Sequence, residues 1–279
     1  MQNRKEIKSE LDMLNVFKII TESYEEISVS RMRQIKDSVL NTRDFLYGLS
    51  EVFSDIRIAE LSVDEKELRH SKKNKCVAVL ITPNSKLYGS IVQKVYKLFL
   101  KELANSTCDI VIIGRVGKEY YEDEKKKRPF RFFEVKDANL TASDIKPIVY
   151  YLLNYERVNV YHGKFEGIIL QNAIETNITG NLNVEDYVKS GAKNEYLFEP
   201  SLSTITGFFE TQIFASFMKQ TVTESQLAGY ASRIQAMESA LETVDVRSKV
   251  LRLSERKVRR ELENKKQLGI VSAALFLNL

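Results

Sequence analysis

The sequence predicts an α/β protein in which a long antiparallel coiled coil of the N- and C-terminal helices carries a central α/β domain. Two narrow apolar stripes at heptad spacing, one at each end of the chain, predict the helices. Short β-branched runs that alternate with helical spacing predict the central domain. We therefore expect three parts, at residues 1–58, 59–200 and 201–279.

The C-terminal stripe is the clearest of these signals. Its residues are 3 and 4 positions apart in strict alternation, and no proline follows Ser201. One long helix is therefore expected, with the apolar segment 268–279 as its tip. The stripe consists of Leu227, Tyr230, Ile234, Met237, Leu241, Val244, Ser248 and Leu251.

The N-terminal 58 residues are predicted to form the partner helix. They contain no proline and a single glycine, Gly48, which costs about 1 kcal/mol relative to alanine in a helix interior. A stripe with spacings of 4 and 3 runs through the second half, and a looser apolar face runs through the first. The stripe is Ile35, Val39, Thr42, Leu46, Leu49, Phe53 and Ile56, and the looser face is Ile7, Leu11, Leu14, Phe17, Ile20, Tyr24 and Ile27.

The central segment reads as a Rossmann-like α/β domain. Two β-branched runs, at 76–82 and 108–114, flank a helical pattern at 90–104, which is the order of a βαβ unit. A third strand is expected at 131–136 and a helix at 144–154, with Pro147 in its first turn. A hairpin is expected at 157–180, with Ile168 and Leu170 in its second strand.

Composition excludes several kinds of site. Cys76 and Cys108 each begin a predicted strand, so they are interpreted as buried reduced thiols rather than as a disulfide or a metal site. His70 and His162 lack partners in any recognisable motif, so both are interpreted as solvated or structural. Neither a metal nor a cofactor is expected. The charged N-terminus and the shortness of the apolar runs predict a cytoplasmic protein.

The segment IIGRVGKEYY, residues 112–121, only partly resembles a phosphate-binding loop. Such a loop needs G-x-x-x-x-G-K-[ST], so that successive backbone N–H groups can surround the phosphates. Here Gly114 and Gly117 are too close together, and Glu119 follows Lys118 in place of a hydroxyl. A turn at the end of a strand is the preferred interpretation.

Basic residues crowd one part of the C-terminal helix. Nine Lys and Arg between residues 247 and 266 meet only three Glu. A smaller group, Arg31, Arg33 and Lys36, lies on the first helix. Such a positive surface favours an acidic partner. Nucleic acid is not expected, because no aromatic residues interleave with these cations.

The segment ESQLAGYASRIQAM at 224–237, with several further motifs in the right order, resembles the gamma subunit of F-type rotary ATPases. That family's pattern at this place is E-S-x-A-S-E-x-x-x-R-M-x-A-M. RKVRR at 256–260 and GIVSAA at 269–274 fall on its N-x-A-R-Q and E-I-V-x-G-A elements. At the other end, IKS at 7–9 and SRMR at 30–33 resemble I-[RK]-S and S-K-M-R, and IT at 20–21 resembles K-I-T with Ile19 in place of the Lys. YLFEP at 196–200 resembles Y-L-[YF]-E-P.

The sequence departs from the family pattern at several positions. The T-S-D-x-G-L-C-G-G loop appears as TPNSKLYGS at 82–90, which keeps only Thr82, Leu87 and Gly89. The Glu of S-E is Gly229. In the C-terminal helix the family's Asn, Gln and Thr are replaced by Arg256, Arg260 and Asn264. These changes affect the hydrogen bonds between a shaft and its catalytic subunits more than the shaft role itself.

The resemblance implies a non-catalytic rotary shaft standing in the central hole of an alpha–beta hexamer. Its implied partners are the alpha and beta catalytic subunits, the epsilon subunit and a membrane ring of c subunits, at the cytoplasmic side of the plasma membrane. Partner contacts are expected in three groups: Arg233, Arg259, Arg260 and Asn264 near the catalytic subunits, Arg31 and Arg33 on the first helix, and Tyr196 and Glu199 in the central domain 59–200, which would be the foot of the shaft.

Three alternatives stay open at this stage. The first is the shaft of a specialised F-type-like ATPase that only hydrolyses ATP, for example to drive surface machinery or motility. The second is a coiled-coil scaffold protein. The third is a nucleotide- or phosphate-dependent enzyme that uses the α/β domain.

Overall fold

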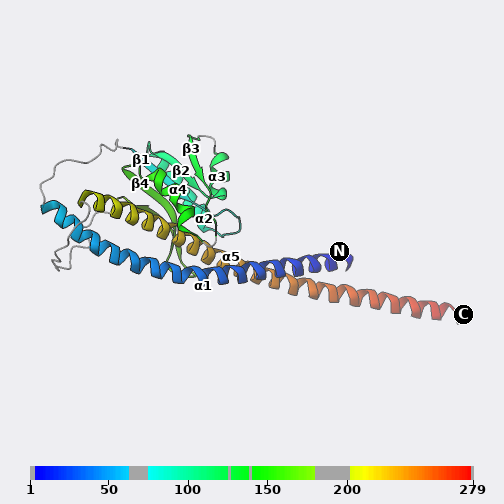
Figure 1. Ribbon diagram of the computed structural model, residues 1–279. Helices are drawn as coiled ribbons and strands as arrows, with labels where there is room; N and C mark the ends of the chain where they lie inside the picture. The colour runs from blue at the N-terminus through cyan, green and yellow to red at the C-terminus, as the bar shows by residue number, and fades with distance from the viewer. Residues whose placement is uncertain (1–3, 63–74, 125–126, 138–139, 180–201, 278–279) are drawn as a thin grey trace. The chain divides into compact units, whose positions relative to one another are not determined.

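The computed structural model describes residues 4–62, 75–124, 127–137, 140–179 and 202–277, and it divides into two compact units. The helical unit combines Met1–Ile27 with Ile234–Leu279, and the sheet unit is Ser28–Arg233. Helix α1 (Arg4–Ser62) and helix α5 (Leu202–Leu277) each contribute residues to both units. The long helices predicted at the two ends of the chain are therefore present (Figure 1).

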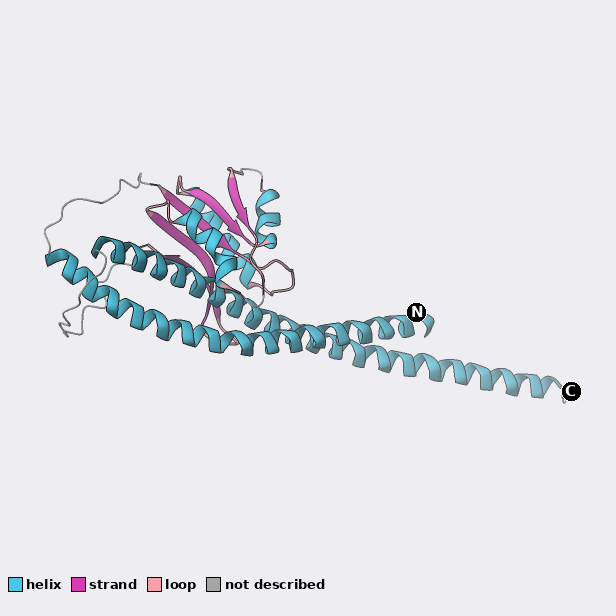
Figure 2. Cartoon of the chain, in the orientation of Figure 1, coloured by secondary structure: helices cyan, strands magenta, loops and turns pink. Residues whose placement is uncertain are grey.

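A five-stranded sheet in the order β3-β2-β1-β4-β5 forms the centre of the sheet unit (Figure 2). β1 (Cys76–Ile81) pairs in parallel with both β2 (Asp109–Ile113) and β4 (Arg157–Phe165). β3 (Phe130–Phe133) extends the parallel part, and β5 (Gln171–Asn177) is antiparallel to β4. Helix α2 (Ile91–Ala104) connects β1 to β2, which confirms the predicted βαβ unit.

Both faces of the sheet are buried, and α5 contributes to both. One face carries Leu80 and Ile112, which share a hydrophobic cluster with Phe99 of α2 and with Leu227 and Tyr230 of α5. The alternate residues of β1 and β2 form a second cluster with α4 (Ala142–Leu152) and with an earlier part of α5. That cluster includes Val77, Val79, Val111, Ile113, Ile148, Phe214, Met218 and Val222. Burial of both faces explains why the two strands read as continuous apolar runs.

The apolar stripe predicted on the C-terminal helix is buried in the structure. Tyr230, Ile234, Met237, Val244 and Leu251 are all buried, and the stripe includes Ser248, which is buried too. Leu241 is half-buried. The 3–4 alternation in the sequence therefore identified the inner side of α5 correctly.

The looser apolar face predicted on the N-terminal helix is wrong in its second half. Phe17 and Ile20 are 51% and 47% exposed, and Tyr24 and Ile27 are exposed as well. Burial instead passes from Ile7, Leu11 and Leu14 to positions 18, 21 and 25, where Thr21 is buried and Lys18 is half-buried. Helix geometry keeps the buried line at alternating 4 and 3 spacing, even where the residues on that line are polar.

Within the helical unit, α1 and α5 run in opposite directions and pack against each other. Ile7 and Leu11 form a small apolar cluster with Leu251. The Arg247 guanidinium donates to the Glu10 carboxylate at 2.6 Å, and Lys18 Nζ lies 2.8 Å from Asp245 Oδ1. Residue numbers therefore decrease along α1 as they increase along the facing side of α5, which makes the two helices antiparallel here. Exposed ion pairs of this kind add about 1 kcal/mol or less each, so apolar burial contributes most to this contact.

The two cysteines form a disulfide, which corrects the prediction of buried reduced thiols. The parallel register aligns Val77 of β1 with Asp109 of β2. Cys76 and Cys108 each precede that aligned pair by one residue, so their Cα atoms are 4.8 Å apart. Both residues are only half-buried. Strand pairing, which a list of cysteine positions does not reveal, brings the two sulfurs together.

Three local predictions also need correction. Thr141 and Asp144 form a capping box that starts α4 at Ala142, so Pro147 is the sixth helical residue rather than part of the first turn. Ile168 and Leu170 lie in the exposed turn before β5, and not in its strand. A helix, α3 (Arg115–Glu122), follows β2 where a turn was expected, and it ends close to the buried Tyr121.

His162 is the structural histidine that the sequence analysis allowed for. It lies in β4, where Nδ1 is 3.1 Å from the Gly163 carbonyl oxygen and Nε2 is 2.9 Å from Thr176 Oγ1. Because a carbonyl can only accept, Nδ1 carries the proton and the Thr176 hydroxyl donates to Nε2. Burial lowers the pKa of His162 to about 4, so the ring is neutral at neutral pH.

This burial makes stability depend on pH. In the unfolded chain a histidine has a pKa of about 6.5, so the unfolded state gains a proton before the folded state does. Stability therefore falls as the pH drops from about 6.5 towards about 4, by about 2 to 3 kcal/mol for this residue. In urea unfolding at about pH 7.5 and about pH 4.5, His162→Gln should lose that share of the pH dependence. An equal drop in both proteins would contradict the assignment.

Candidate functional site

Polar side chains gather where the parallel strands of the sheet unit end. The loop after β1, Thr82–Ser90, meets the segment after β3 and one face of α5. Thr82 anchors the start of this loop, because its hydroxyl donates to the Ile113 carbonyl at 3.0 Å and accepts the Gly117 N–H at 2.9 Å. The carboxyl ends of parallel strands are the usual place for a ligand in α/β sheets, so this edge of the sheet is a candidate site.

The glycines of the partial phosphate-loop motif pack against Thr82. Gly114 has a φ of 99°, and a Cβ there would lie 1.9 Å from the Thr82 carbonyl oxygen. A Cβ at Gly117 would lie 2.6 Å from Thr82 Oγ1. The space that a phosphate would need is therefore filled by the chain itself. The glycines serve close packing of β1, β2 and α3.

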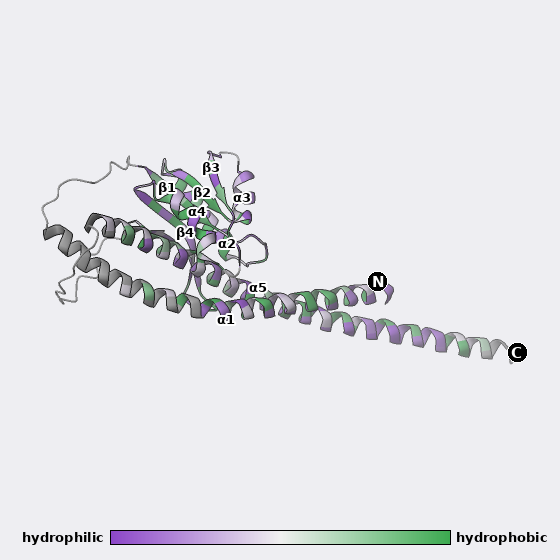
Figure 3. Ribbon diagram, viewed as in Figure 1, coloured by the Kyte–Doolittle hydropathy of each residue, from purple (hydrophilic) through white to green (hydrophobic). Residues whose placement is uncertain are grey.

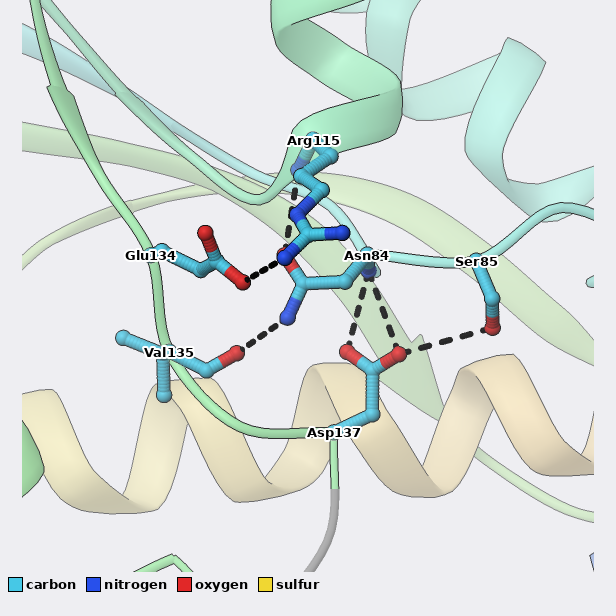
Figure 4. A network of polar contacts seen from close by, with 6 residues as sticks. All are labelled: Asn84, Ser85, Arg115, Glu134, Val135 and Asp137. Carbon is cyan, nitrogen blue, oxygen red and sulfur yellow. Dashed lines mark hydrogen bonds and ion pairs between the residues drawn. The ribbon is translucent and has the colours of Figure 1, made fainter.

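Asn84 ties the ends of three elements together (Figure 4). Its side-chain amide donates to the Val135 carbonyl at 2.6 Å, and its side-chain oxygen accepts the Arg115 N–H at 3.1 Å. Its own backbone N–H donates to the Asp137 carboxylate at 3.0 and 3.2 Å. These groups all bond to one another within the chain. The network therefore positions the loop and does not present these groups to a ligand.

Asp137 is the carboxylate at the centre of this network. Burial raises its pKa, and the N–H bond from Asn84 and the nearby charge of Arg233 oppose that rise. The Ser85 hydroxyl lies 3.5 Å from the same carboxylate. A carboxylate whose two oxygens share the Asn84 backbone N–H is positioned to hold a loop rather than to transfer protons.

Arg233 of α5 lies across the same loop and is only 5% exposed. Its Nε donates to the Leu87 carbonyl at 3.0 Å, and one terminal nitrogen donates to the Lys86 carbonyl at 3.0 Å and to Ser85 Oγ at 3.3 Å. The guanidinium carbon lies 3.6 Å from the centre of the Tyr88 ring. The family resemblance predicts Arg233 near partner subunits, and the contacts described above are with residues of the same chain.

A small cavity lies beside the network. Its lining is mostly apolar and includes Tyr88, Ile91, Asp137 and Gly229. Its volume is about 40 Å³, enough for a water molecule or two, whereas pockets for drug-sized ligands occupy about 300–1,000 Å³. Over the described residues, no group of His, Cys, Asp and Glu could hold a metal ion.

The second candidate surface is the basic segment of α5 in the helical unit. Lys8, Arg252, Arg256 and Arg259 line an open groove of about 520 Å³ between α1 and α5, together with Asp12 and Glu255. Figure 3 shows the C-terminal stretch of α5 as mostly hydrophilic. Cations outnumber acids in this groove, so it can receive the carboxylates of an acidic partner.

The remaining predicted contact residues lie in different places. Arg259, Arg260 and Asn264 are exposed on α5, and Arg259 Nε lies 3.7 Å from a Glu263 oxygen. Arg33 is exposed on α1, while Arg31 is half-buried and donates to Gln34 at 3.2 Å. Tyr196 and Glu199 lie outside the described residues.

Sequence reasoning missed Asp137, Tyr88 and Tyr230 as members of the network. Tyr230 was placed in the apolar stripe, which is correct for its ring. The available signal was the order of the chain, because both the 82–90 loop and Asp137 directly follow predicted parallel strands and must share one edge of the sheet.

Comparison with known proteins gives a consistent match. The model of the ATP synthase family matches residues 3–274. The chain is 25% identical to the ATP synthase gamma chain of Protochlamydia amoebophila, covering 98% of this chain and 99% of the relative. It is 22% identical to the gamma chain of Bdellovibrio bacteriovorus, covering 98% of each.

Solved structures share the fold. A chain of the Euglena gracilis mitochondrial ATP synthase has a TM-score of 0.67 at 15% identity and covers 98% of this chain and 94% of its own length. A chain from the central stalk and c-ring structure of the Tetrahymena thermophila enzyme has a TM-score of 0.60 at 19% identity, covering 79% of this chain and 99% of its own. Among the described helices, none is both long and apolar enough to cross a membrane.

The Asn84 network predicts a specific effect of charge. Asn84→Asp removes the N–H donor to the Val135 carbonyl and places a negatively charged carboxylate beside that oxygen. We expect a loss of about 1–3 kcal/mol in the free energy of unfolding, because a buried acceptor loses its partner. Asn154→Asp is the matched control, since that amide also donates to backbone carbonyls but is exposed. Equal urea midpoints for Asn84→Asp and the unaltered chain would contradict this role.

Proposed function

This chain belongs to the ATP synthase family, and we propose that it is the gamma subunit, the central rotary shaft of an F-type ATP synthase. The observation that carries the proposal is the match to gamma chains, which extends over nearly the whole length of this chain and of each relative. Chains of two solved ATP synthases, one of them from a central stalk and c-ring structure, share the fold over 98% and 79% of this chain and support the proposal.

The proposed partners follow from this role. The alpha and beta catalytic subunits would surround the helices, and the epsilon subunit and the membrane ring of c subunits would contact the foot. The relatives are synthase chains, which favours the synthase over a hydrolysis-only motor or a scaffold. The subunit itself would be non-catalytic, and it would lie peripherally at the cytoplasmic side of the plasma membrane as part of the complex.

The domain plan is proposed on the same grounds. Residues 1–58 and 201–279 would form the antiparallel coiled coil, and residues 59–200 would form the foot. The opposite directions of α1 and α5 in the helical unit support this, as does the burial of their 3–4 seam. Tyr196 and Glu199 would belong to the foot surface.

The exposed face of the helical unit suits a surrounding collar of subunits. Phe17 and Ile20 of α1 and Val246 and Val250 of α5 are exposed apolar residues, which a partner would cover. Arg259, Arg260 and Asn264 would meet polar and acidic groups of the catalytic subunits, and Arg31 and Arg33 would add contacts from α1. Arg233 would lie near the catalytic subunits and would act on them through the loop Thr82–Ser90, which it binds.

An asymmetric shaft explains how rotation and catalysis are coupled. Around the shaft, three catalytic sites would face different sides of the helical pair. Each orientation then favours a different nucleotide state in each site, because a contact shifts an equilibrium by its differential affinity for the two states. Ion-driven rotation would thereby drive ATP synthesis, and ATP hydrolysis would drive the reverse rotation.

Co-expression with alpha and beta subunits from the same source tests the proposal. The chain should elute in one complex with three copies of each partner, and ATP turnover should depend on it. Elution of the chain alone, or as a self-associated species, would overturn the assignment.

Within that complex, the double substitution of Arg259 and Arg260 by Gln should lower ATP turnover by about three- to tenfold, because two cations facing acidic groups are lost. Lys97→Gln on the exposed face of α2 is the matched control and should leave turnover unchanged. Equal turnover in the double variant would show that the basic segment does not act on the catalytic subunits.

A further inference from the structure

We propose that the loop Thr82–Ser90 and Arg233 form a torque joint, a locked contact that makes the sheet and α5 turn as one body within the sheet unit. Arg233 is its positioning residue. The inference rests on the proposed shaft function and adds to it the place where force passes between the foot and the long helix. It also gives a role to the loop that departs from the family pattern.

The loop has a backbone conformation that needs external support. Among the described residues, Leu87 is the one non-glycine residue with positive φ, at 71°. A residue with a Cβ is strained in this region, and such conformations persist only where surrounding contacts fix them. The carbonyl that Arg233 Nε binds, at 3.0 Å, is that of Leu87 itself. Arg233 therefore holds the strained residue in place.

The guanidinium suits this task because it is planar and can bind several acceptors at once. It contacts four consecutive residues: Ser85, Lys86 and Leu87 by hydrogen bonds, and Tyr88 through the face of its ring. A buried cation must be compensated by such groups. A lysine at the same position would keep the charge but could not bind all of these acceptors in one plane.

The loop and the helix also interlock in shape. Gly89 has a φ of 66°, and a Cβ there would lie 2.5 Å from the backbone oxygen of Ser232. On the helix side, a Cβ at Gly229 would lie 3.0 Å from the Tyr88 ring. The loop backbone thus approaches the helix backbone at Gly89, and the Tyr88 ring approaches the helix at Gly229, so neither position has room for a side chain.

A second strand end is fixed by the same helix face. The Gln226 side chain donates to the Lys136 carbonyl at 2.9 Å, and the Tyr230 hydroxyl donates to the Asp137 carbonyl at 2.7 Å. Residues 226, 230 and 233 are 4 and 3 positions apart, so they lie on one side of α5. Asp137 in turn accepts the Asn84 N–H, which joins the two strand-end segments to each other.

Directional contacts of this kind resist a force that apolar packing alone does not. Packed helices can slide by small shear movements, because apolar contacts are not directional. Hydrogen bonds weaken steeply when their angle changes. The five bonds from Gln226, Tyr230 and Arg233 to the two strand-end segments would each be distorted if α5 turned relative to the sheet.

The test measures torsional stiffness in the complex with alpha and beta subunits. A gold particle is attached at Lys97→Cys on α2, the hexamer is immobilised, and the angular spread of the particle is recorded without ATP. Arg233→Gln should raise the angular variance about twofold or more, and Arg233→Lys should give an intermediate value. If the angular variance of Arg233→Gln equals that of the unaltered chain, the proposed joint is overturned.

Arg128→Gln is the matched control. Arg128 also donates to two backbone carbonyls, those of Ser106 and Leu103, but both lie within the α/β part and not on α5. It should lower thermal stability as Arg233→Gln does and leave the angular variance unchanged. A rise of equal size in Arg128→Gln would show a general loss of stability and would overturn the joint.

A second measurement separates the joint from the proposed function. In the free full-length chain, amide hydrogen exchange at Lys86–Ser90 should be at least about tenfold faster in Arg233→Gln and unchanged in Arg128→Gln. If the unaltered chain fails to assemble with its partners, the shaft function fails, and this exchange result still decides whether Arg233 fixes the loop. Unchanged exchange in Arg233→Gln and Arg233→Lys would contradict the joint.

Discussion

The sheet unit depends on the burial of α5 against both faces of its sheet. Met218 and Val222 complete the apolar cluster on one face, and Leu227 and Tyr230 complete the cluster on the other. Without this helix, the strands would expose two rows of β-branched residues. The same helix then continues as one half of the helical unit. A single helix therefore contributes to the core of the sheet unit and to the helical unit.

Polar contacts add direction to that apolar burial. The hydrophobic effect holds the helix on the sheet but does not fix its rotation. Arg233 binds a backbone group in the loop after β1, and Tyr230 and Gln226 bind backbone groups in the segment after β3. Apolar burial thus stabilises the packing of α5 on the sheet, and the hydrogen bonds fix the register of the helix on the sheet.

Much of the fold could be predicted because its signals are periodic and local. The 3–4 alternation from Leu227 to Leu251 identified the buried side of α5, and the two β-branched runs identified β1 and β2. The prediction of the buried face of α1 was wrong where the buried positions carry polar residues. Thr21 is buried there, while Phe17 and Ile20 are exposed. Apolar character alone was a misleading guide there.

The site was less predictable because it depends on pairings between distant segments. Arg233 binds residues that are 146 to 148 positions away in the chain. The Cys76–Cys108 disulfide likewise requires the register of β1 and β2, which no spacing of cysteines encodes. The family match at Arg233 pointed to a functional residue, and the hydrogen bonds described for it go to the loop Thr82–Ser90 of the same chain.

The most direct test of the central claim is to watch the chain turn. With the alpha and beta subunits fixed to a surface and a gold particle attached to α2, addition of ATP should produce stepwise rotation in a single direction. The rotation should stop when ATP is removed. Continued ATP turnover by an intact complex with a stationary particle would show that the chain is a static component and would contradict the account.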